Sequence, residues 1–385
     1  MIALIYIENY LIICWVETRI VSINKHDKKR VITLKVNLLG SSVSEIEAVL
    51  GQFDVSQYRT KQTFRSIYRN RVNSIDEISV LSLDLRAKLK GIADVRLPSI
   101  IEVECADDDT QKILFQTEGN SRVEAVIIKD DDRLTGCLSS QVGCVVGCKF
   151  CSTGGIGFQR NLNAGEILGQ YFEMEKSAGK KLNNIVFMGM GEPLLNRQEV
   201  FKAIELLTDP KGIGFPQRKI TISTFGLIPG IEAMIKSNLK VNFAVSLSAT
   251  TEEQRQILIP TYRKYTIKKI IKAANKFALS SGDRVSINYL LLNNVNDSDA
   301  DAERLSELLR GLRSKVNIME FNGGYGKFSR SDNFQVDQFV NTLLKNRVKV
   351  TRRTSKGADI GAACGQLAAG YAAKIQEVPD TVPVD

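Results

Sequence analysis

The stretch from Cys137 to Cys151 reads CLSSQVGCVVGCKFC, and it decides how the rest of the chain is interpreted. Its last three cysteines, Cys144, Cys148 and Cys151, have the spacing C-x3-C-x2-C. Thiols this close together are badly placed for a disulfide framework but well placed to surround a metal. A [4Fe–4S] cluster normally takes four cysteine ligands, so a loop with three leaves one iron open to a small molecule. The spacing therefore predicts an iron–sulfur cluster.

The neighbouring residues favour the cluster over a zinc site. Gly147, Gly154 and Gly155 can adopt the positive φ that a loop curled round a cluster needs. Structural zinc takes four protein ligands, and the only histidine, His26, lies in a distant charged stretch. An iron with an open position can hold the amino and carboxylate groups of S-adenosylmethionine and pass an electron to its sulfonium. A zinc knuckle or a chance cluster of cysteines is the alternative at this stage.

Length and composition limit the number of domains, the cellular compartment and the kinds of partner. The 385 residues allow a domain of about 250 residues and a smaller accessory domain. Hydrophobic residues make up 43% of the chain, which is enough for a full core. Seven cysteines without a secretory signal indicate the reducing cytoplasm. The net charge of +9 has the sign that RNA binding requires, although many basic proteins bind no polyanion.

The apolar start of the chain raises the question of a membrane segment. Residues 1–15 are too few to span a bilayer, which takes about 20 apolar residues, and Glu8 and Asn9 interrupt the run. No basic region precedes it, which argues against a signal peptide. We expect no membrane association and interpret residues 1–36 as an extension, either a strand or an overlong start.

Helical patterns begin near residue 37, over 42–50, 57–70 and 82–90. On the second of these helices Lys61, Arg65 and Arg69 recur every four residues and so lie on one face. This basic stripe is either an ordinary solvated face or part of an RNA-binding surface.

Short β-rich runs follow at 100–104, 112–117 and 123–128, divided by turns rich in Asp and Gly. They predict a small antiparallel β extension between the helical region and the cysteine motif.

Strands and helices alternate after Cys151. Six strands are expected, at 184–189, 219–223, 241–247, 284–291, 316–321 and 347–352. Helices lie between them, for example 163–176, which starts with a capping-box pattern, and 300–312. Repeated βα units imply a parallel sheet with right-handed crossovers. Such a sheet carries its site at the carboxyl ends of its strands, where four polar positions fall: Glu192, Ser223, Ser246 and Asn322.

The chain resembles the radical S-adenosylmethionine superfamily, and within it the RlmN/Cfr family of RNA adenine methyltransferases. Besides the cluster cysteines, four blocks carry the resemblance in the same order: GMGEPLLN at 189–196, STFG at 223–226, SLSA at 246–249 and AACGQL at 362–367. The resemblance implies an α/β fold with a partial (β/α)6-type radical SAM barrel, an N-terminal helical accessory domain and a small antiparallel β extension.

The resemblance also implies the domain boundaries. We expect a poorly matched extension at 1–36, a helical RNA-binding domain at 37–95 and the β extension at 96–136. The partial barrel then covers 137–370 and a C-terminal tail 371–385.

The family's cofactors and their ligands carry over residue by residue. Cys144, Cys148 and Cys151 would hold a [4Fe–4S] cluster with an open iron for S-adenosylmethionine. Glu192 suits the α-ammonium group of the cofactor and Gly191 a close backbone approach. A glutamate that lines the core or caps a helix N-terminus is the alternative. The remaining expected contacts lie at neighbouring strand ends, at Ser223, Ser246, Leu247, Ser248 and Asn322.

Two further cysteines have a role in the chemistry that the resemblance implies. A first S-adenosylmethionine methylates Cys364, and a second yields a 5′-deoxyadenosyl radical that takes a hydrogen atom from this methyl group. The methylene radical adds to the adenine ring, and Cys137 then attacks Cys364 to form a disulfide and release the RNA. Glu124 matches the proton acceptor. The alternative is that Cys137 is a small buried hydrophobic residue.

The expected function is methylation of an adenine ring carbon, C2 in preference to C8, in 23S-type rRNA and in tRNA. The expected electron donor is a flavodoxin or ferredoxin, and the protein is expected to be a cytoplasmic monomer. Ser248 stands where the family has histidine, and GGYG at 323–326 replaces a proline after Asn322. A radical enzyme of the same fold with another RNA site, a protein or a small molecule as substrate is therefore the alternative. A non-catalytic RNA-binding relative is disfavoured by the intact cysteines.

Overall fold

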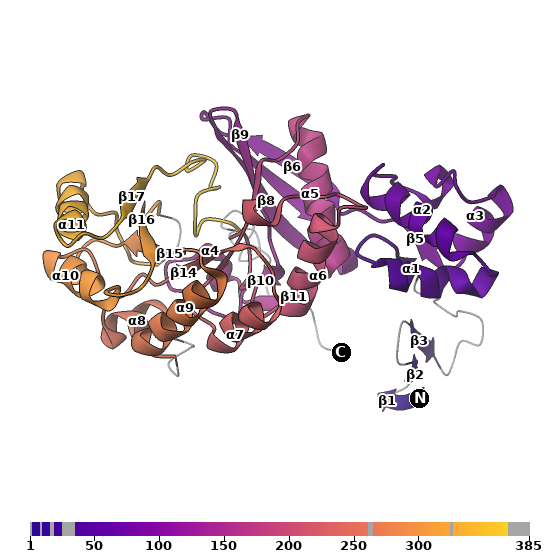
Figure 1. Ribbon diagram of the computed structural model, residues 1–385, viewed down its shortest axis with the longest axis horizontal. Coiled ribbons are helices and arrows are strands. Elements are labelled where there is room, and N and C mark those ends of the chain that lie inside the picture. Colours follow the sequence, from indigo (N-terminus) through magenta and orange to yellow (C-terminus); the bar gives the residue numbers. More distant parts are fainter. Residues whose placement is uncertain are drawn as a thin grey trace, which may run out of the picture. The chain divides into compact units, whose positions relative to one another are not determined.

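The computed structural model describes residues 35–260, 265–323 and 326–368, together with the backbone of three N-terminal strands. By its internal contacts the chain forms two units (Figure 1). One contains residues 1–97 and 206–214, and the other contains 98–205 and 215–385. In the described ranges, no helix is long and apolar enough to cross a membrane.

The first unit is mainly helical from residue 35 onward. Its elements are the antiparallel strands β1 (Ile2–Ile7), β2 (Tyr10–Trp15) and β3 (Arg19–Asn24), the parallel pair β4 (Val36–Asn37) and β5 (Ala93–Asp94), and the helices α1 (Val43–Leu50), α2 (Gln57–Tyr68) and α3 (Leu83–Leu89). Ser42 begins α1 with a capping box, in which Glu45 Oε2 accepts from the Ser42 amide at 2.7 Å.

Tyr68 at the end of α2 is the centre of this helical core. Its ring is fully buried against Phe64, with ring centroids 4.5 Å apart. Its hydroxyl donates to the Ser41 carbonyl at 2.8 Å and accepts from the Gly40 amide at 2.9 Å. Because the apolar face of α2 is buried in this way, Lys61, Arg65 and Arg69 lie exposed on the other side, as expected from their spacing.

The second unit is built on a ten-stranded open sheet. Its strands are β6 (Ser99–Cys105), β7 (Gln111–Gln116), β8 (Arg122–Asp130), β9 (Arg133–Cys137), β12 (Asn184–Phe187), β13 (Ile220–Thr224), β14 (Asn242–Ser246), β15 (Val285–Leu291), β16 (Ser314–Glu320) and β17 (Val350–Arg353). The strand order is β17-β16-β15-β14-β13-β12-β9-β8-β7-β6. In this order, neighbouring strands from β17 to β9 pair in parallel, and neighbouring strands from β9 to β6 pair antiparallel.

Strand β9 joins the β extension to the parallel strands. It pairs antiparallel with β8, where Cys137 lies opposite Val126, and parallel with β12, where Cys137 lies opposite Val186. The sequence analysis missed this strand because it is only five residues long and lies between an Asp-rich turn and the cysteine motif. The extension and the parallel strands are therefore one continuous sheet.

Helices follow the parallel strands in the alternation expected from the sequence (Figure 1). They are α5 (Ala164–Ala178), α6 (Arg197–Thr208), α7 (Ile228–Lys236), α8 (Glu252–Leu258), α9 (Ile267–Ser281), α10 (Asp299–Leu308) and α11 (Asn333–Lys345). The predicted capping box at Asn163 and Glu166 is confirmed. Apolar side chains of the strands pack on these helices, as Phe243 of β14 does on Phe277 of α9, with ring centroids 4.7 Å apart.

Candidate active site

The three-cysteine loop lies between the short antiparallel strands β10 (Gln141–Gly143) and β11 (Phe158–Asn161), and the one-turn helix α4 (Ser152–Gly155) follows it. The Cys144 amide donates to the Gly157 carbonyl at 2.9 Å, which closes the base of the loop. Gly147 has the expected positive φ, of 65°. Gly154 and Gly155 lie in α4 instead, and the other two positive-φ glycines of the loop are Gly143 and Gly157.

The thiols of this loop are close enough to influence each other's charge. Cys144, Cys148 and Cys151 are free and partly buried. Burial raises the pKa of Cys144 to about 12, and the nearby Glu192 and Cys151 add to this effect. Burial, followed by Cys151 and Cys144, also raises the pKa of Cys148. Thiols in such surroundings gain most when a metal takes the place of the proton.

Unpartnered buried polar atoms beside the loop indicate that it is built to surround another group. Within the described part of the chain, the hydroxyl of Ser152 and the Nε and Nη1 atoms of Arg255 are buried without a hydrogen-bond partner. Ser152 follows Cys151 directly, and the charge of Arg255 acts on Cys148. Buried polar groups are nearly always satisfied in folded proteins, so the residues present fit a polar, anionic group at this place.

Glu192 lies buried at the carboxyl end of β12. Its Oε1 accepts from the Leu194 amide at 3.0 Å and its Oε2 from the Phe225 amide at 3.0 Å. Burial raises its pKa to about 7, although these amides oppose the shift. A carboxylate has about four acceptor positions, so Glu192 retains capacity for an ammonium group. Its own amide donates to Gln141 Oε1 at 2.9 Å.

Contacts within the protein require a glycine at position 191. Its φ is 99°, and a Cβ at this position would lie 2.6 Å from the Cβ of Gln141. The close approach predicted from the sequence is therefore made to Gln141, a residue that the sequence analysis did not single out.

The other expected cofactor contacts lie at the ends of neighbouring strands or just after them. The hydroxyls of Ser223 and Ser246 lie 3.2 Å apart at adjacent strand ends. Leu247 and Ser248 are buried, and the Ser248 hydroxyl already accepts from the Leu290 amide at 3.2 Å. Asn322 is half-buried, and its carbonyl accepts from the Gln366 side chain at 3.0 Å.

The segment that carries Cys364 is fastened to the cysteine loop. The Ser152 amide donates to the Gly365 carbonyl at 2.7 Å, and the Thr153 hydroxyl donates to the Leu367 carbonyl at 3.0 Å. Gln366 fixes the turn by accepting from the Ala363 amide at 3.1 Å. In Figure 1 the yellow segment that follows β17 runs back towards the strands of the β extension.

The same segment is also held by the β extension. Lys112 Nζ donates to the Ile360 carbonyl at 2.6 Å, and Asp108 accepts from the Gly357 amide at 3.1 Å. Arg352, at the start of the segment, pairs with Glu320 at 2.8 Å and with Asp337 at 2.9 Å. The predicted β extension therefore positions the Cys364 loop.

Cys137 and Cys364 lie 227 positions apart in the sequence, yet the charge of Cys364 acts on the Cys137 thiol. Burial raises the pKa of the Cys137 thiol, and Cys364 raises it further. The Cys364 residue as a whole is exposed, but its sulfur is surrounded by protein atoms. Burial of the sulfur, followed by the nearby Cys151, raises the pKa of Cys364, whereas Arg353 lowers it. Both thiols are free.

Glu124 of β8 is tied to the same loop. Its Oε2 accepts from the Ala368 amide at 2.6 Å, four positions beyond Cys364. Burial raises its pKa, while this amide and Lys112 oppose the shift. The three residues expected to carry the chemistry, Cys137, Cys364 and Glu124, thus come from β9, the C-terminal segment and β8.

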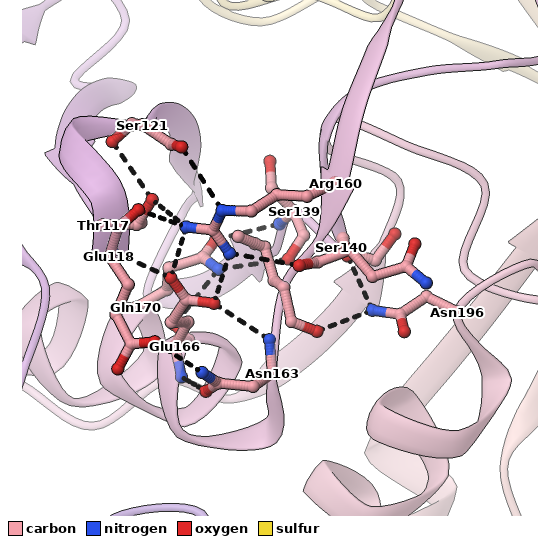
Figure 2. Close-up of polar contacts among 12 residues, drawn as sticks. Thr117, Glu118, Ser121, Ser139, Ser140, Arg160, Asn163, Glu166, Gln170 and Asn196 are labelled. Carbon is pink, nitrogen blue, oxygen red and sulfur yellow. Dashed lines mark hydrogen bonds and ion pairs between the residues drawn. The ribbon is translucent and has the colours of Figure 1, made fainter. Parts of the chain in front are cut away.

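A buried polar network supports the strand that enters the cysteine loop (Figure 2). Arg160 of β11 binds both oxygens of Glu166 at 2.7 and 2.8 Å and also reaches Thr117 at 2.9 Å. Gln170 accepts from the Ser139 amide at 2.9 Å, and Asn196 donates to the Ser140 carbonyl at 2.8 Å. Sequence reasoning found Asn196 only as part of the GMGEPLLN block, and Arg160 and Gln170 gave no local signal.

Comparison with known proteins defines the class of this site. Residues 138–305 match the profile of the radical SAM superfamily, and residues 36–95 match the profile described as the ribosomal RNA large subunit methyltransferase N-terminal domain. A crystal structure of a radical SAM methyltransferase from Sphaerobacter thermophilus superposes with a TM-score of 0.82 at 38% identity, over 87% of this chain and 99% of that one. The fold is thus that of a radical SAM methyltransferase, with the sheet open.

Sequence relatives narrow the class to one family. The dual-specificity RNA methyltransferase RlmN of Geotalea uraniireducens is 40% identical over 334 residues, which cover 86% of this chain and 96% of the relative. The probable dual-specificity RNA methyltransferase RlmN of Thermotoga neapolitana is 39% identical, over 86% and 97% of the two chains. The chain belongs to the RlmN family of radical SAM methyltransferases.

Proposed function

We propose that this enzyme methylates a ring carbon of adenine in RNA, C2 in preference to C8, with 23S-type rRNA and tRNA as substrates. The names of its relatives support an RNA substrate. The match of residues 36–95 to an N-terminal domain of ribosomal RNA methyltransferases supports rRNA among these substrates.

The observation that carries the proposal is that the free cysteine Cys364 is held at the three-cysteine loop, where its charge acts on a second free cysteine, Cys137. A radical enzyme that only cleaves S-adenosylmethionine needs neither Cys137 nor Cys364. Here the turn of Cys364 is bonded to Ser152 next to Cys151, and the charge of Cys364 acts on Cys137. This pairing supports a methyl group that is carried on one cysteine and released by the other.

Cys144, Cys148 and Cys151 would hold the [4Fe–4S] cluster, with Glu192, Ser223, Ser246 and the backbone at Gly191, Leu247, Ser248 and Asn322 around S-adenosylmethionine. When bound, S-adenosylmethionine and the cluster would supply the methyl group, remove one hydrogen atom from it and take back one electron after it has joined the adenine ring. The residues themselves bind and orient the reactants.

Cys364 acts first, as a thiolate that accepts the methyl group, with loss of its proton to solvent. Once the methylene carbon is bonded to the adenine carbon, Glu124 takes the proton that this ring carbon gives up. The Cys137 thiolate then attacks the Cys364 sulfur. The new S–S bond replaces the S–CH2 bond, the released carbon is protonated to methyl, and two electrons from a cellular thiol later reduce the disulfide.

The cellular setting follows from this chemistry. The six cysteines of the described ranges are free thiols, which supports a reducing compartment, the cytoplasm. A one-electron donor of the flavodoxin or ferredoxin type would supply the cluster, and the proposed steps need only one copy of the chain.

The test uses a bacterial strain that lacks its own 2-methyladenosine in rRNA and tRNA. Expression of the wild-type chain is expected to restore 2-methyladenosine in mass spectrometry of digested RNA. Cys364→Ala is expected to restore none. Cys105→Ala is the matched control, because Cys105 is an exposed free cysteine on the edge strand β6.

Two results would contradict the proposal. One is 8-methyladenosine as the main product, which would reverse the choice of carbon. The other is 5′-deoxyadenosine production by the purified enzyme without any methylated adenine, which would assign the radical to a different substrate.

A further inference from the structure

Arg255 is a buried cation with unused hydrogen-bonding capacity. It lies on α8 and is 3% exposed. Its Nη2 donates to the Phe225 carbonyl at 2.8 Å, whereas Nε and Nη1 have no partner in the described part of the chain. An arginine is always charged and has only donors, and a buried donor without a partner is costly. The two unpartnered donors therefore fit a bound group with acceptor atoms.

The surroundings of Arg255 identify where that group lies. Burial lowers the pKa of Arg255, and the nearby Cys148 and Glu252, which lies three residues earlier on the same helix, oppose this shift. Glu252 is itself engaged, since its Oε1 accepts from the Ile267 amide at 2.8 Å. Helix α8 is also bonded directly to the cysteine loop, because the Lys149 amide donates to the Leu258 carbonyl at 2.9 Å.

Phe225 connects Arg255 to Glu192. The amide of Phe225 donates to Glu192 Oε2 at 3.0 Å, and its carbonyl accepts from Arg255. The amide of Phe225 thus holds Glu192 and its carbonyl holds Arg255. The charges of both side chains act on Cys148. A carboxylate suits the ammonium group of S-adenosylmethionine, which leaves the guanidinium for an anion.

We propose that Arg255 is a positioning residue for the cluster, whose Nε–H and Nη1–H groups would donate to sulfurs of the bound cluster. The inference rests on the cluster in the proposed function. Hydrogen bonds to the sulfurs and nearby charge set the reduction potential of iron–sulfur clusters. A fixed positive charge stabilises the reduced, more negative cluster, so Arg255 raises its potential.

The test compares R255M, which removes the charge and the donors, with R255K, which keeps the charge but loses the two-donor geometry. R304M is the matched control, since Arg304 is a partly buried arginine of the same unit that is ion-paired with Asp301 on α10. Each protein is reconstituted anaerobically with iron and sulfide. Iron content, the potential of the cluster without S-adenosylmethionine, and the dissociation constant of S-adenosylmethionine are measured.

R255M is expected to have a more negative cluster potential than the wild type, R255K an intermediate one, and R304M an unchanged one. Equal potentials in all four proteins would overturn the inference. A weaker affinity for S-adenosylmethionine at unchanged potential would also overturn it, because the anion would then be the cofactor's carboxylate. If the wild type itself takes up no iron, the proposed function fails instead.

Discussion

At the scale of single residues, Cys137 and Cys364 differ in their surroundings in the way that their proposed roles require. Cys364 is an exposed residue, although its neighbours Ala363 and Gln366 are buried, and Cys137 is buried at the end of β9. An exposed residue can be reached by S-adenosylmethionine and RNA in succession. A buried residue is shielded from both, which suits a residue that resolves a covalent intermediate.

Replacing Cys137 with alanine is expected to stop the reaction after the methylene carbon has joined the RNA. Cys137→Ala should still carry a methyl group on Cys364 and still produce 5′-deoxyadenosine. Because no thiol can break the S–CH2 bond, RNA should remain attached to the protein. A species that survives denaturation on a gel and disappears on nuclease treatment is the measurement.

Two controls accompany this experiment. Cys364→Ala should show neither methyl group nor attached RNA, and Cys105→Ala should behave as the wild type. Normal turnover by Cys137→Ala without attached RNA would reduce Cys137 to a core residue and remove the resolving step.

Glu124 gives a prediction for pH. The proposed proton acceptor must be ionised, and burial raises its pKa. RNA methylation should therefore fall on the acid side at a higher pH than for an ordinary glutamate, whose pKa is about 4.3. Glu124→Gln keeps an oxygen for the Ala368 amide but cannot take a proton, so the rate should fall about 10²–10⁴-fold. Methylation of Cys364, which precedes this step, should be unchanged in a mass spectrum of the protein. An equal loss in both reactions would assign Glu124 to holding the loop only.

At the level of single residues, the sequence carries a local signal for the cysteine loop, whereas other features of the candidate site depend on long-range contacts. The spacing of Cys144, Cys148 and Cys151 places the three thiols on one loop whatever surrounds it. Arg255 lies in an ordinary helical pattern, and its burial against Phe225 depends on contacts 30 positions apart. Ser248 is an expected cofactor contact, and the bond of its hydroxyl to the Leu290 amide of β15 likewise depends on a residue 42 positions away.

At the scale of elements, the cysteine loop depends on a backbone contact at its base. Gly143 of β10 has φ 72°, and a Cβ there would lie 1.8 Å from the Gly157 carbonyl oxygen. A side chain at this position must push β10 and β11 apart. Because Cys144 follows Gly143 directly, any such shift moves the first thiol of the loop.

Gly143→Ala is therefore expected to lower both the melting temperature and the iron content after reconstitution. Gly119→Ala is the matched control, since Gly119 has φ 66° but nothing within 4 Å of its would-be Cβ. Both substitutions meet the strain of a left-handed backbone, about 1–2 kcal/mol, and only the first has the collision. Equal effects of the two on iron content would show that the contact at the base of the loop is unimportant.

Strand prediction followed the same division between local and long-range signals. Strands with apolar residues at every second position, such as Val285, Ile287 and Tyr289 of β15, are found because this alternation places one set of side chains in the core. Strand β9 has the sequence RLTGC, in which only Leu134 and Cys137 are apolar. Its place between β8 and β12 is fixed by pairing on both sides, which no window of sequence records.

At the scale of the whole molecule, the basic stripe and the residues of the proposed chemistry belong to different units. The cysteines and their supports lie in the second unit, whereas the exposed stripe of Lys61, Arg65 and Arg69 lies in the first. The first unit contains no residue of the proposed chemistry. Its basic stripe can therefore be altered without touching the site.

A triple alanine variant of the stripe is expected to bind RNA more weakly while it methylates Cys364 normally. Each lysine or arginine that contacts a phosphate contributes a released counterion, and for single-stranded RNA the slope of log affinity against log salt changes by about 0.7 per contact. Loss of three contacts should make that slope less steep by about 2. The measurement is a salt titration of binding to an rRNA fragment.

Helix α9 provides a control with the same charge and spacing. Lys268, Lys272 and Lys276 are exposed and also recur every four residues, but they lie in the second unit. Replacing all three with alanine lowers the net charge of the protein by the same amount. If affinity depends on net charge alone, the two triple variants will lose it equally and the stripe on α2 has no special role. If α2 contacts phosphates, only its variant will show the reduced salt slope, because counterion release requires contact with the RNA and not merely a positive protein.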